Sequence, residues 1–208
     1  MTVEEANMFI TFEGGEGSGK TTVVKKVAEE LIKLNYEVLI TREPGGSKVA
    51  EQIRNIILDK NNTSITAETE ALLFAASRTQ HLEEIIIPAL KRGQIVLCDR
   101  FVDSSLAYQA YARELGFDFV LKANDYAMKN LPELTFYCDV DPELGLKRIS
   151  TRDNLNRLDL ENIAFHEKVR NGYKEVVKRF PNRVVEINAN GTIDEMLIDI
   201  MRILKERL

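Results

Sequence analysis

A glycine-rich segment near the start of the chain carries residue types that bind phosphate. Residues 14–21 read Gly-Gly-Glu-Gly-Ser-Gly-Lys-Thr, which fits the pattern G-x-x-x-x-G-K-(S/T) at all four fixed positions. Glycines let the backbone curl so that several N–H groups converge on one anion, and a following helix N-terminus adds positive potential. The pattern predicts that Lys20 reaches the β- and γ-phosphates of a nucleotide and that the Thr21 hydroxyl ligates Mg²⁺.

The surroundings of this segment also match a phosphate-binding loop. An apolar run at 8–12 precedes it, and a helical pattern at 22–34 follows it. The alternative is a glycine-rich turn without a ligand, and the matching flanks argue against that alternative. We therefore expect the nucleotide phosphates to be bound by Gly14, Gly15, Glu16, Gly17, Ser18, Gly19, Lys20, Thr21 and Thr22.

An acidic and a basic residue stand together at the end of another apolar run. Asp99 and Arg100 follow residues 95–98 directly. In phosphate-loop proteins an acid in this position helps to hold Mg²⁺, whereas the plainer alternative is a cap on the next helix. A guanidinium suits a bidentate contact with phosphate oxygens, and the carboxyl edge of an open α/β sheet is where ligands bind. We expect Thr21 and Asp99 on the metal side and Arg100 on a phosphate.

Strand-like and helical segments alternate along the chain, and they must position these residues. Strands are expected at 8–13, 37–41, 95–99, 134–139 and 184–187. Helices are expected at 22–34, 68–92 with a possible kink at Pro88, 103–114, 117–130, 142 to about 152, 160–179, and 193–208 after the N-cap Thr192. This alternation predicts an α/β fold of the phosphate-loop NTPase type, with a parallel five-stranded sheet, helices on both faces and one domain over 1–208.

Composition narrows the possible partners and location. The formal net charge of −5 argues against nucleic acid as a partner and favours small anions held by local positive groups. No apolar run approaches about 18 residues, so we expect neither a membrane span nor a signal peptide. Cys98 and Cys138 lie in apolar runs and are predicted to be reduced core thiols of a cytoplasmic protein. His81 and His166 lack metal-ligand spacing and are predicted to be structural or surface residues.

Five further segments, from about residue 9 to the end of the chain, resemble the thymidylate kinase family. They are Thr41-Arg42-Glu43-Pro44-Gly45-Gly46, Phe74-Ala75-Ala76-Ser77-Arg78, residues 99–109, Asn156-Arg157-Leu158-Asp159 and residues 165–173. The resemblance implies transfer of a phosphoryl group from ATP with Mg²⁺ to dTMP, giving dTDP for dTTP synthesis, by a homodimer. It leaves open the preference between dTMP and dUMP.

The resemblance also assigns roles around the acceptor nucleotide. It implies that Phe74 stacks on thymine, that Arg78 bonds the base edge, and that Glu16 accepts a bond from the sugar hydroxyl. Further residues that it places in this pocket are Pro44, Arg100, Ser105, Tyr108 and Gln109. The residue pattern alone favours core packing for Phe74 and Tyr108 and a surface position for Gln109. Arg78 lies on the same helical face as Phe74, which argues against a sealed core there because an unpaired buried guanidinium is costly.

A polar break at 153–159 is interpreted as part of a lid over about 148–160, and three arginines, Arg148, Arg152 and Arg157, bracket this lid. The resembled family includes a type whose phosphate loop lacks arginine and whose lid supplies it. Because this loop has no arginine, Arg152 is expected to join Lys20 and Arg100 in catalysis. Arg148 is expected to pack on adenine, or else to be a solvated residue favoured by the helix dipole.

Some residue roles and alternative functions stay open from the sequence alone. Many relatives have Asp-Arg-(Ile/Phe)-Glu where this chain has residues 156–159, so the roles of Asn156 and Asp159 stay open. A GTPase switch would need Asn-Lys-x-Asp and Asp-x-x-Gly segments, which the sequence lacks. A non-catalytic nucleotide-binding subunit would not need a second pocket. A kinase for another small acceptor is the closest alternative.

Overall fold

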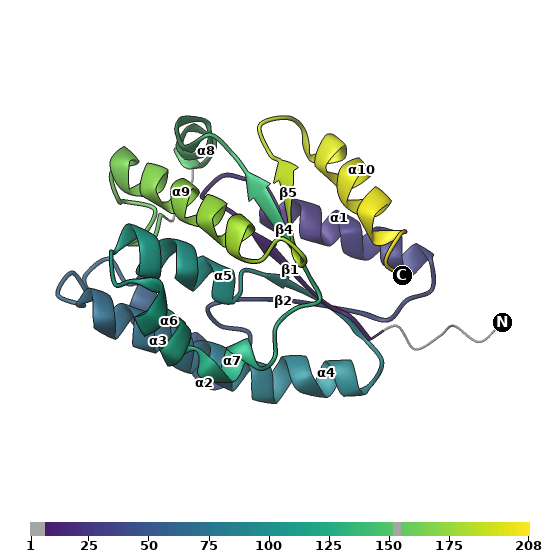
Figure 1. Ribbon diagram of the computed structural model, residues 1–208, viewed down its shortest axis with the longest axis horizontal. Helices are drawn as coiled ribbons and strands as arrows, with labels where there is room; N and C mark the ends of the chain where they lie inside the picture. Colours follow the sequence, from purple (N-terminus) through teal and green to yellow (C-terminus); the bar gives the residue numbers. More distant parts are fainter. Residues whose placement is uncertain (1–6, 152–154) are drawn as a thin grey trace.

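A five-stranded parallel sheet forms the centre of the computed structural model, which describes residues 7–151 and 155–208. The strands are β1 (Phe9–Glu13), β2 (Val38–Arg42), β3 (Ile95–Asp99), β4 (Leu134–Asp139) and β5 (Val184–Asn188), in the order β2-β3-β1-β4-β5 (Figure 1). The predicted fold class and all five predicted strands are confirmed. Every residue of β1 and β4 is buried, which explains their continuous apolar runs.

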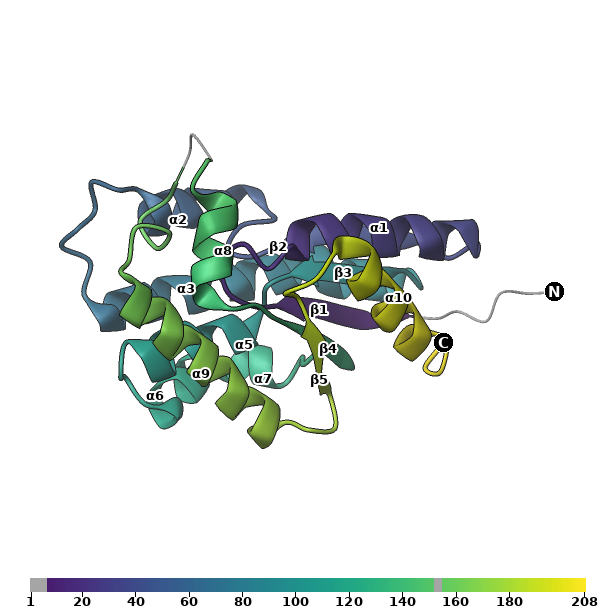
Figure 2. The same ribbon diagram turned by 90° about the horizontal axis from the view of Figure 1, so that it is seen from above.

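Helices cover both faces of the sheet, and successive strand residues face them in turn. On one face, Ile10 and Phe12 join a cluster with apolar side chains of α1 (Lys20–Lys33) and α10 (Ile193–Leu204). On the other face, Phe9 packs with Leu82 and Phe101. Tyr137 of β4 packs there with α9 (Ile163–Arg179). Figure 2 shows α1 and α9 on opposite sides of the sheet.

The long helix expected at 68–92 is present as a continuous rod of three segments (Figure 1). They are α3 (Ala67–His81), a π-helical turn η1 (Leu82–Ile86) and α4 (Ile87–Lys91). Pro88 lies in the first turn of α4, directly after the π-helical turn. Because proline has no N–H, the regular ladder cannot pass through it, and a wider turn there is physically reasonable.

Other helices differ from expectation in length or number. The helix expected at 103–114 is α5 (Val102–Ser105) followed by a π-helical segment, η2 (Leu106–Ala112). The single helix expected at 117–130 is wrong: α6 (Phe117–Ala123) and α7 (Asp125–Met128) are separated at Asn124. The Asn124 side chain bonds Arg78 and the Val120 carbonyl, which stabilises the break. The helices α8 (Pro142–Ile149), α9 and α10 are shorter at one end than expected.

One helix was not expected from the sequence at all. α2 (Lys48–Leu58) lies between β2 and α3 and packs against α3. Its buried residues, Ala50 and Ile57, lie about two helical turns apart on one face, and charged and polar residues lie between them in the sequence. By contrast, the Thr192 N-cap is confirmed, and Thr192 and Glu195 form a reciprocal capping box.

Both cysteines are free and fully buried, as expected. Burial raises the pKa of the Cys138 thiol to about 12 and also raises that of Cys98. None of the helices in residues 7–151 and 155–208 has the length and apolar content that a membrane crossing needs.

Candidate functional site

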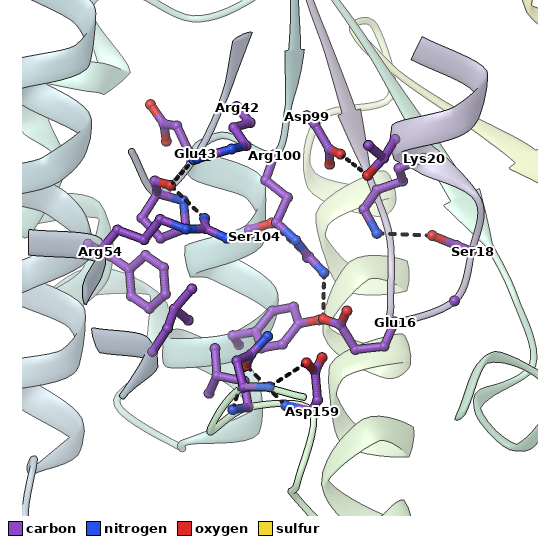
Figure 3. A pocket seen from close by; sticks show the side chains of 18 of the residues that line it. Glu16, Ser18, Lys20, Arg42, Glu43, Arg54, Asp99, Arg100, Ser104 and Asp159 are labelled. Carbon is purple, nitrogen blue, oxygen red and sulfur yellow. Dashed lines mark hydrogen bonds and ion pairs between the residues drawn. The ribbon is translucent and has the colours of Figure 1, made fainter. Parts of the chain in front are cut away.

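A cavity of about 340 Å³ opens at the carboxyl edge of the sheet. Figure 3 shows its two sides, with Lys20 and Ser18 on one and Arg54 and Glu43 on the other. Strand register explains the convergence, because Phe12 pairs with Asp99 on β3 and with Phe136 on β4, so these strands end side by side. Segments 16–22, 42–44, 99–104 and 156–159 supply most of the lining, together with side chains from α2, α3 and η2.

The phosphate-type loop holds its lysine with neutral acceptors. Lys20 Nζ donates to the carbonyls of Gly14 at 2.9 Å and Gly15 at 2.8 Å, and to Ser18 Oγ at 3.0 Å. Burial lowers the pKa of Lys20, with Arg100 acting in the same direction. Because a phosphate is a stronger partner for an ammonium group than a carbonyl, this lysine can turn to a bound nucleotide.

The loop touches helix α8 backbone to backbone. A Cβ on Gly17, whose φ is +67°, would lie 2.1 Å from the Gly145 carbonyl oxygen, and one on Gly145 would lie 2.2 Å from the Glu16 carbonyl oxygen. Neither distance is possible for real atoms, so glycine at both positions is what lets α8 approach the loop.

Thr21 and Asp99, both expected on the metal side, meet at the edge of the cavity. Thr21 Oγ1 donates to Asp99 Oδ2 at 2.5 Å. A hydroxyl and a carboxylate are hard oxygen ligands of the kind Mg²⁺ takes, with water and nucleotide phosphates completing its shell. The described part of the chain holds no group of three or more His, Cys, Asp or Glu that could cage a metal on its own.

Arg100 and Glu16 form the central ion pair of the cavity. Arg100 Nη2 lies 2.6 Å from Glu16 Oε1, and Tyr108 Oη donates to the same oxygen at 2.9 Å (Figure 3). Burial alone would raise the pKa of Glu16, but Arg100 and Lys20 outweigh it and hold that pKa at about 2. Glu16 is therefore ionised at neutral pH, and its contact with Arg100 fixes the position of its carboxylate.

The backbone of Arg100 is unusual, and a buried acid supports it. Its φ is +73°, a conformation that residues with a side chain seldom adopt. Glu13, fully buried at the end of β1, accepts from Phe101 N at 2.6 Å and Ser104 Oγ at 2.6 Å. Burial, reinforced by Asp103, raises the pKa of Glu13 to about 7. The sequence analysis did not identify Glu13 as part of the site.

Arg54 is a basic cavity residue that the sequence analysis did not assign to the site. It projects from α2, lines the cavity and donates to the Pro44 carbonyl at 2.7 Å. Pro44 lines the cavity too, and neighbouring Arg42 pairs with Glu51 at 2.9 Å. Because α2 itself was not recognised, nothing in the sequence analysis placed Arg54 here. The apolar spacing of Ile53 and Ile57 is the signal that could have found it.

Phe74 and Arg78 share a helical face, but only Phe74 lines the cavity. Phe74 packs with Ile57 and Leu158. The expectation that Arg78 avoids a sealed core is wrong, because it is 1% exposed. Its charge is paired with Glu43 at 2.7 Å. Further bonds run from Arg78 to Ser105 Oγ, Asn124 Oδ1 and the Phe101 carbonyl.

These contacts place Arg78 and Ser105 behind the cavity wall instead of on it. Tyr108 and Gln109 do line the cavity. The surface position that the residue pattern favoured for Gln109 is wrong, since Gln109 is 1% exposed. Its amide is held by Glu70 of α3, whose carboxylate also receives Arg113 and Arg157.

The arginines expected around a lid have different positions. Arg148 donates to the carbonyls of Gly17 and Ala189, and also to those of Asn190 and Gly191, so it ties the phosphate-type loop to the start of α10. Arg157 binds Glu70 and the Ile57 carbonyl. Arg152 lies outside the described residues, and its catalytic role remains a prediction.

Asn156 and Asp159, whose roles the sequence left open, line the cavity and form a turn. Asn156 Oδ1 accepts from Leu158 N at 2.8 Å, and Asp159 Oδ2 accepts from Asn156 N at 2.8 Å. Both histidines are buried within the fold. His81 is fully buried between Glu43 and Thr41, and His166 is 5% exposed.

Comparisons with known proteins agree with this geometry. A family model described as thymidylate kinase matches residues 12–200. Thymidylate kinase of Acholeplasma laidlawii (strain PG-8A) is 55% identical over 203 residues, which cover 97% of this chain and 100% of that protein. The relative of the same name from Clostridium novyi (strain NT) is 52% identical over 200 residues, 95% of this chain and 98% of its own. A crystal structure of thymidylate kinase from Ehrlichia chaffeensis superposes with a TM-score of 0.78 at 32% identity, covering 95% of this chain and 98% of that one.

Proposed function

The chain belongs to the thymidylate kinase family, and from this membership we propose that it transfers the γ-phosphoryl group of ATP to dTMP, giving dTDP and ADP for dTTP synthesis. The observation that carries the proposal is one cavity with two cationic sides. Lys20 of the phosphate loop stands on one side, and Arg100 and Arg54 face it from the other. A transfer between two nucleotides needs both phosphate sites within one enclosure.

The loop side suits the donor nucleotide. Loop N–H groups and Lys20 bind the β- and γ-phosphates, and Lys20 leaves the Gly14 and Gly15 carbonyls to do so. Thr21 and Asp99 would hold Mg²⁺, which neutralises charge that develops on the transferred group. Arg148 is placed by its bonds to the 189–191 carbonyls beside the loop, consistent with packing on adenine.

The opposite side suits dTMP. Arg100 and Arg54 would bind its phosphate, and the Glu16 carboxylate, already anionic, would accept a hydrogen bond from the sugar hydroxyl. Phe74 lies where it can stack on the base, an interaction worth about 1–3 kcal/mol in comparable base–aromatic contacts. Pro44, Tyr108 and Gln109 complete the lining. Arg78 and Ser105 would act from behind this wall.

No strong general base is needed, because the attacking phosphate oxygen is already anionic near neutral pH. Alignment and neutralisation of charge account for catalysis. Lys20 and Arg100 hold the two phosphate groups so that attack is in line. Arg152, on the strength of the sequence alone, would add a positive charge to the transition state.

Assembly and location are also proposals. We infer a homodimer from the family resemblance, and exposed apolar side chains of α2 and α3, among them Ile56 (48% exposed) and Leu72 (52% exposed), support it. Sedimentation velocity of the purified protein tests this assignment. A cytoplasmic location is consistent with the two buried, unpaired thiols.

A coupled assay of ADP release tests the function. ATP-Mg is offered with dTMP, dUMP, dCMP, dAMP or dGMP in turn. We expect dTMP to give the largest kcat/KM, and a rate with dTMP no higher than the ATPase background would overturn the proposal. Faster turnover of another monophosphate would instead identify a kinase for that acceptor.

A further inference from the structure

Gln109 lines the proposed nucleotide cavity, and the nitrogen of its side-chain amide already makes a hydrogen bond within the protein. Its Nε2 donates to Glu70 Oε1 at 2.9 Å. Glu70 lies on α3 and Gln109 on η2, and each residue is 1% exposed. The bond therefore joins two helices in a buried position. A polar group that lacks a suitable hydrogen-bond partner there would lower the stability of the folded state.

The chemistry of Glu70 dictates which way the Gln109 amide faces. Glu70 is ion-paired with Arg113, at 3.4 Å, and with Arg157. A carboxylate accepts hydrogen bonds and cannot donate, so an amide oxygen facing it would place two acceptors together. Only the amide nitrogen can occupy that position, and the carbonyl oxygen must take the other end. Among the described residues, no protein donor bonds that oxygen.

We propose that Glu70 is a positioning residue that fixes the polarity of the Gln109 amide, so that the cavity presents a hydrogen-bond acceptor to the edge of a pyrimidine. The inference rests on the proposed function and adds the residue that sets base selectivity. A glutamine that is free to turn can offer either its donor or its acceptor end and so discriminates poorly. Held by Glu70, it offers the acceptor end.

A fixed acceptor separates two classes of pyrimidine. Thymine and uracil carry an N–H at position 3, whereas cytosine carries a lone pair there. A lone pair opposite the Gln109 oxygen would leave two buried acceptors without a donor, and sites of this kind reject the mismatched ligand strongly. The inference therefore predicts that selectivity against a cytosine base depends on Glu70, although Glu70 contacts the nucleotide only through Gln109.

The test compares dTMP with 5-methyl-dCMP, which keeps the methyl group and differs only at positions 3 and 4 of the ring. In Glu70→Gln, the new side-chain amide at position 70 can donate a hydrogen bond as well as accept one. The Gln109 amide can then rotate by 180° and place its oxygen towards residue 70. Glu161→Gln is the matched control, because Glu161 pairs with the same Arg113, at 2.5 Å, and no bond joins it to Gln109. We expect the ratio of kcat/KM for dTMP over 5-methyl-dCMP to fall at least tenfold in Glu70→Gln and to stay within twofold in Glu161→Gln.

A second background separates positioning from general loosening of the fold. In Gln109→Ala, adding Glu70→Gln should leave the ratio unchanged, because the group through which Glu70 acts is gone. An equal fall in both backgrounds would overturn the proposal. Glu70→Asp keeps the negative charge between Arg113 and Arg157 but retracts it from Gln109, and it should also lose selectivity, with its folding checked by thermal unfolding.

Different experimental results would overturn the proposed function and the role of Glu70. A wild-type protein that does not phosphorylate dTMP overturns the function. A wild-type enzyme that is active on dTMP, with the same selectivity in folded Glu70→Gln and Glu70→Asp, overturns the role of Glu70 alone.

Discussion

The guanidinium of Arg100 lies 2.6 Å from the carboxylate of Glu16, across the boundary between the two halves of the site. Glu16 belongs to the phosphate loop, and Arg100 follows β3, on the side of the cavity proposed for the acceptor. In the proposed function, the pair would align a carboxylate for the sugar hydroxyl of dTMP with a cation for the phosphate of the same nucleotide.

Glu16→Gln should impair use of dTMP more than use of ATP. The substitution removes the charge that restrains Arg100 while keeping the shape and an acceptor oxygen. Bonds to charged groups contribute about 1.5–3 kcal/mol, so we expect kcat/KM for dTMP to fall roughly tenfold to a hundredfold. Initial rates with each substrate varied in turn check this, and an increase in the KM for ATP of the same size would contradict it.

Arg54→Met should raise the KM for dTMP by about tenfold or more, because it removes from the cavity wall a guanidinium that the proposed function assigns to the dTMP phosphate. The KM for ATP should change little. Lys48→Met is the control, since Lys48 lies exposed on the same helix and does not line the cavity. Steady-state kinetics that leave the KM for dTMP unchanged in Arg54→Met would assign this arginine to structure.

Gly145→Ala should damage nucleotide binding from outside the cavity. Its methyl group would stand 2.2 Å from the Glu16 carbonyl, so either α8 or the loop must move. We expect kcat/KM for ATP to fall about tenfold or more. In Gly116→Ala, a Cβ meets nothing within 4 Å, although φ is +79°. That control costs about 1 kcal/mol of stability and should leave the KM for ATP unchanged.

Glu13 should make the protein less stable as pH rises from 5 to 8. Its pKa is raised from 4.5 to about 7 in the folded state, so the folded protein binds more protons than the unfolded chain between these values. By linkage, this contribution is largest below pH 4.5 and is lost as pH rises towards 7, a change on the order of 3 kcal/mol. Denaturant unfolding should show a flatter pH profile in Glu13→Gln than in the wild type.

Arg152→Ala should lower kcat by about 10²–10³ and change the KM for dTMP little, if this arginine stabilises the transition state. Lys147→Ala, at an exposed position of α8, is the control. Arg152→Ala with the kcat of the wild type would refute the assignment and leave Arg100 and Lys20 as the cations that stabilise the transition state.

The sequence was most informative where short-range rules decide the outcome. The five strands were predicted because short apolar runs alternate with helical patterns, and the runs of β1 and β4 are continuous because both strands are fully buried. Thr21 at the end of the phosphate loop and Asp99 at the end of β3 were each expected on the metal side, and they are in contact. α2 was missed although its apolar residues Ala50, Ile53 and Ile57 follow helical spacing, because the segment lies between two recognised motifs and was treated as their connection. The position of Arg54 on the cavity wall was missed for the same reason, since it depends on where α2 lies.

Long-range pairing explains the remaining errors. Arg78 was expected to avoid a sealed environment, but Glu43, 35 residues earlier, neutralises it there. Gln109 was judged a surface residue because amides usually are, and only the fold brings Glu70 to it. Glu13 and Glu70 themselves carried no local signal, because a buried acid is recognised by its partners and these lie on other elements.

The burial of both native thiols makes this chain convenient for selective chemical labelling. Cys98 and Cys138 are fully buried in the sheet, and their raised pKa values keep little reactive thiolate at neutral pH. A cysteine introduced at an exposed residue such as Lys60 should therefore react with a maleimide dye while the native pair is left intact. Since the chain has no tryptophan, Phe74→Trp would in addition give an intrinsic fluorophore at the cavity wall, and two optical reporters could follow nucleotide binding in one molecule.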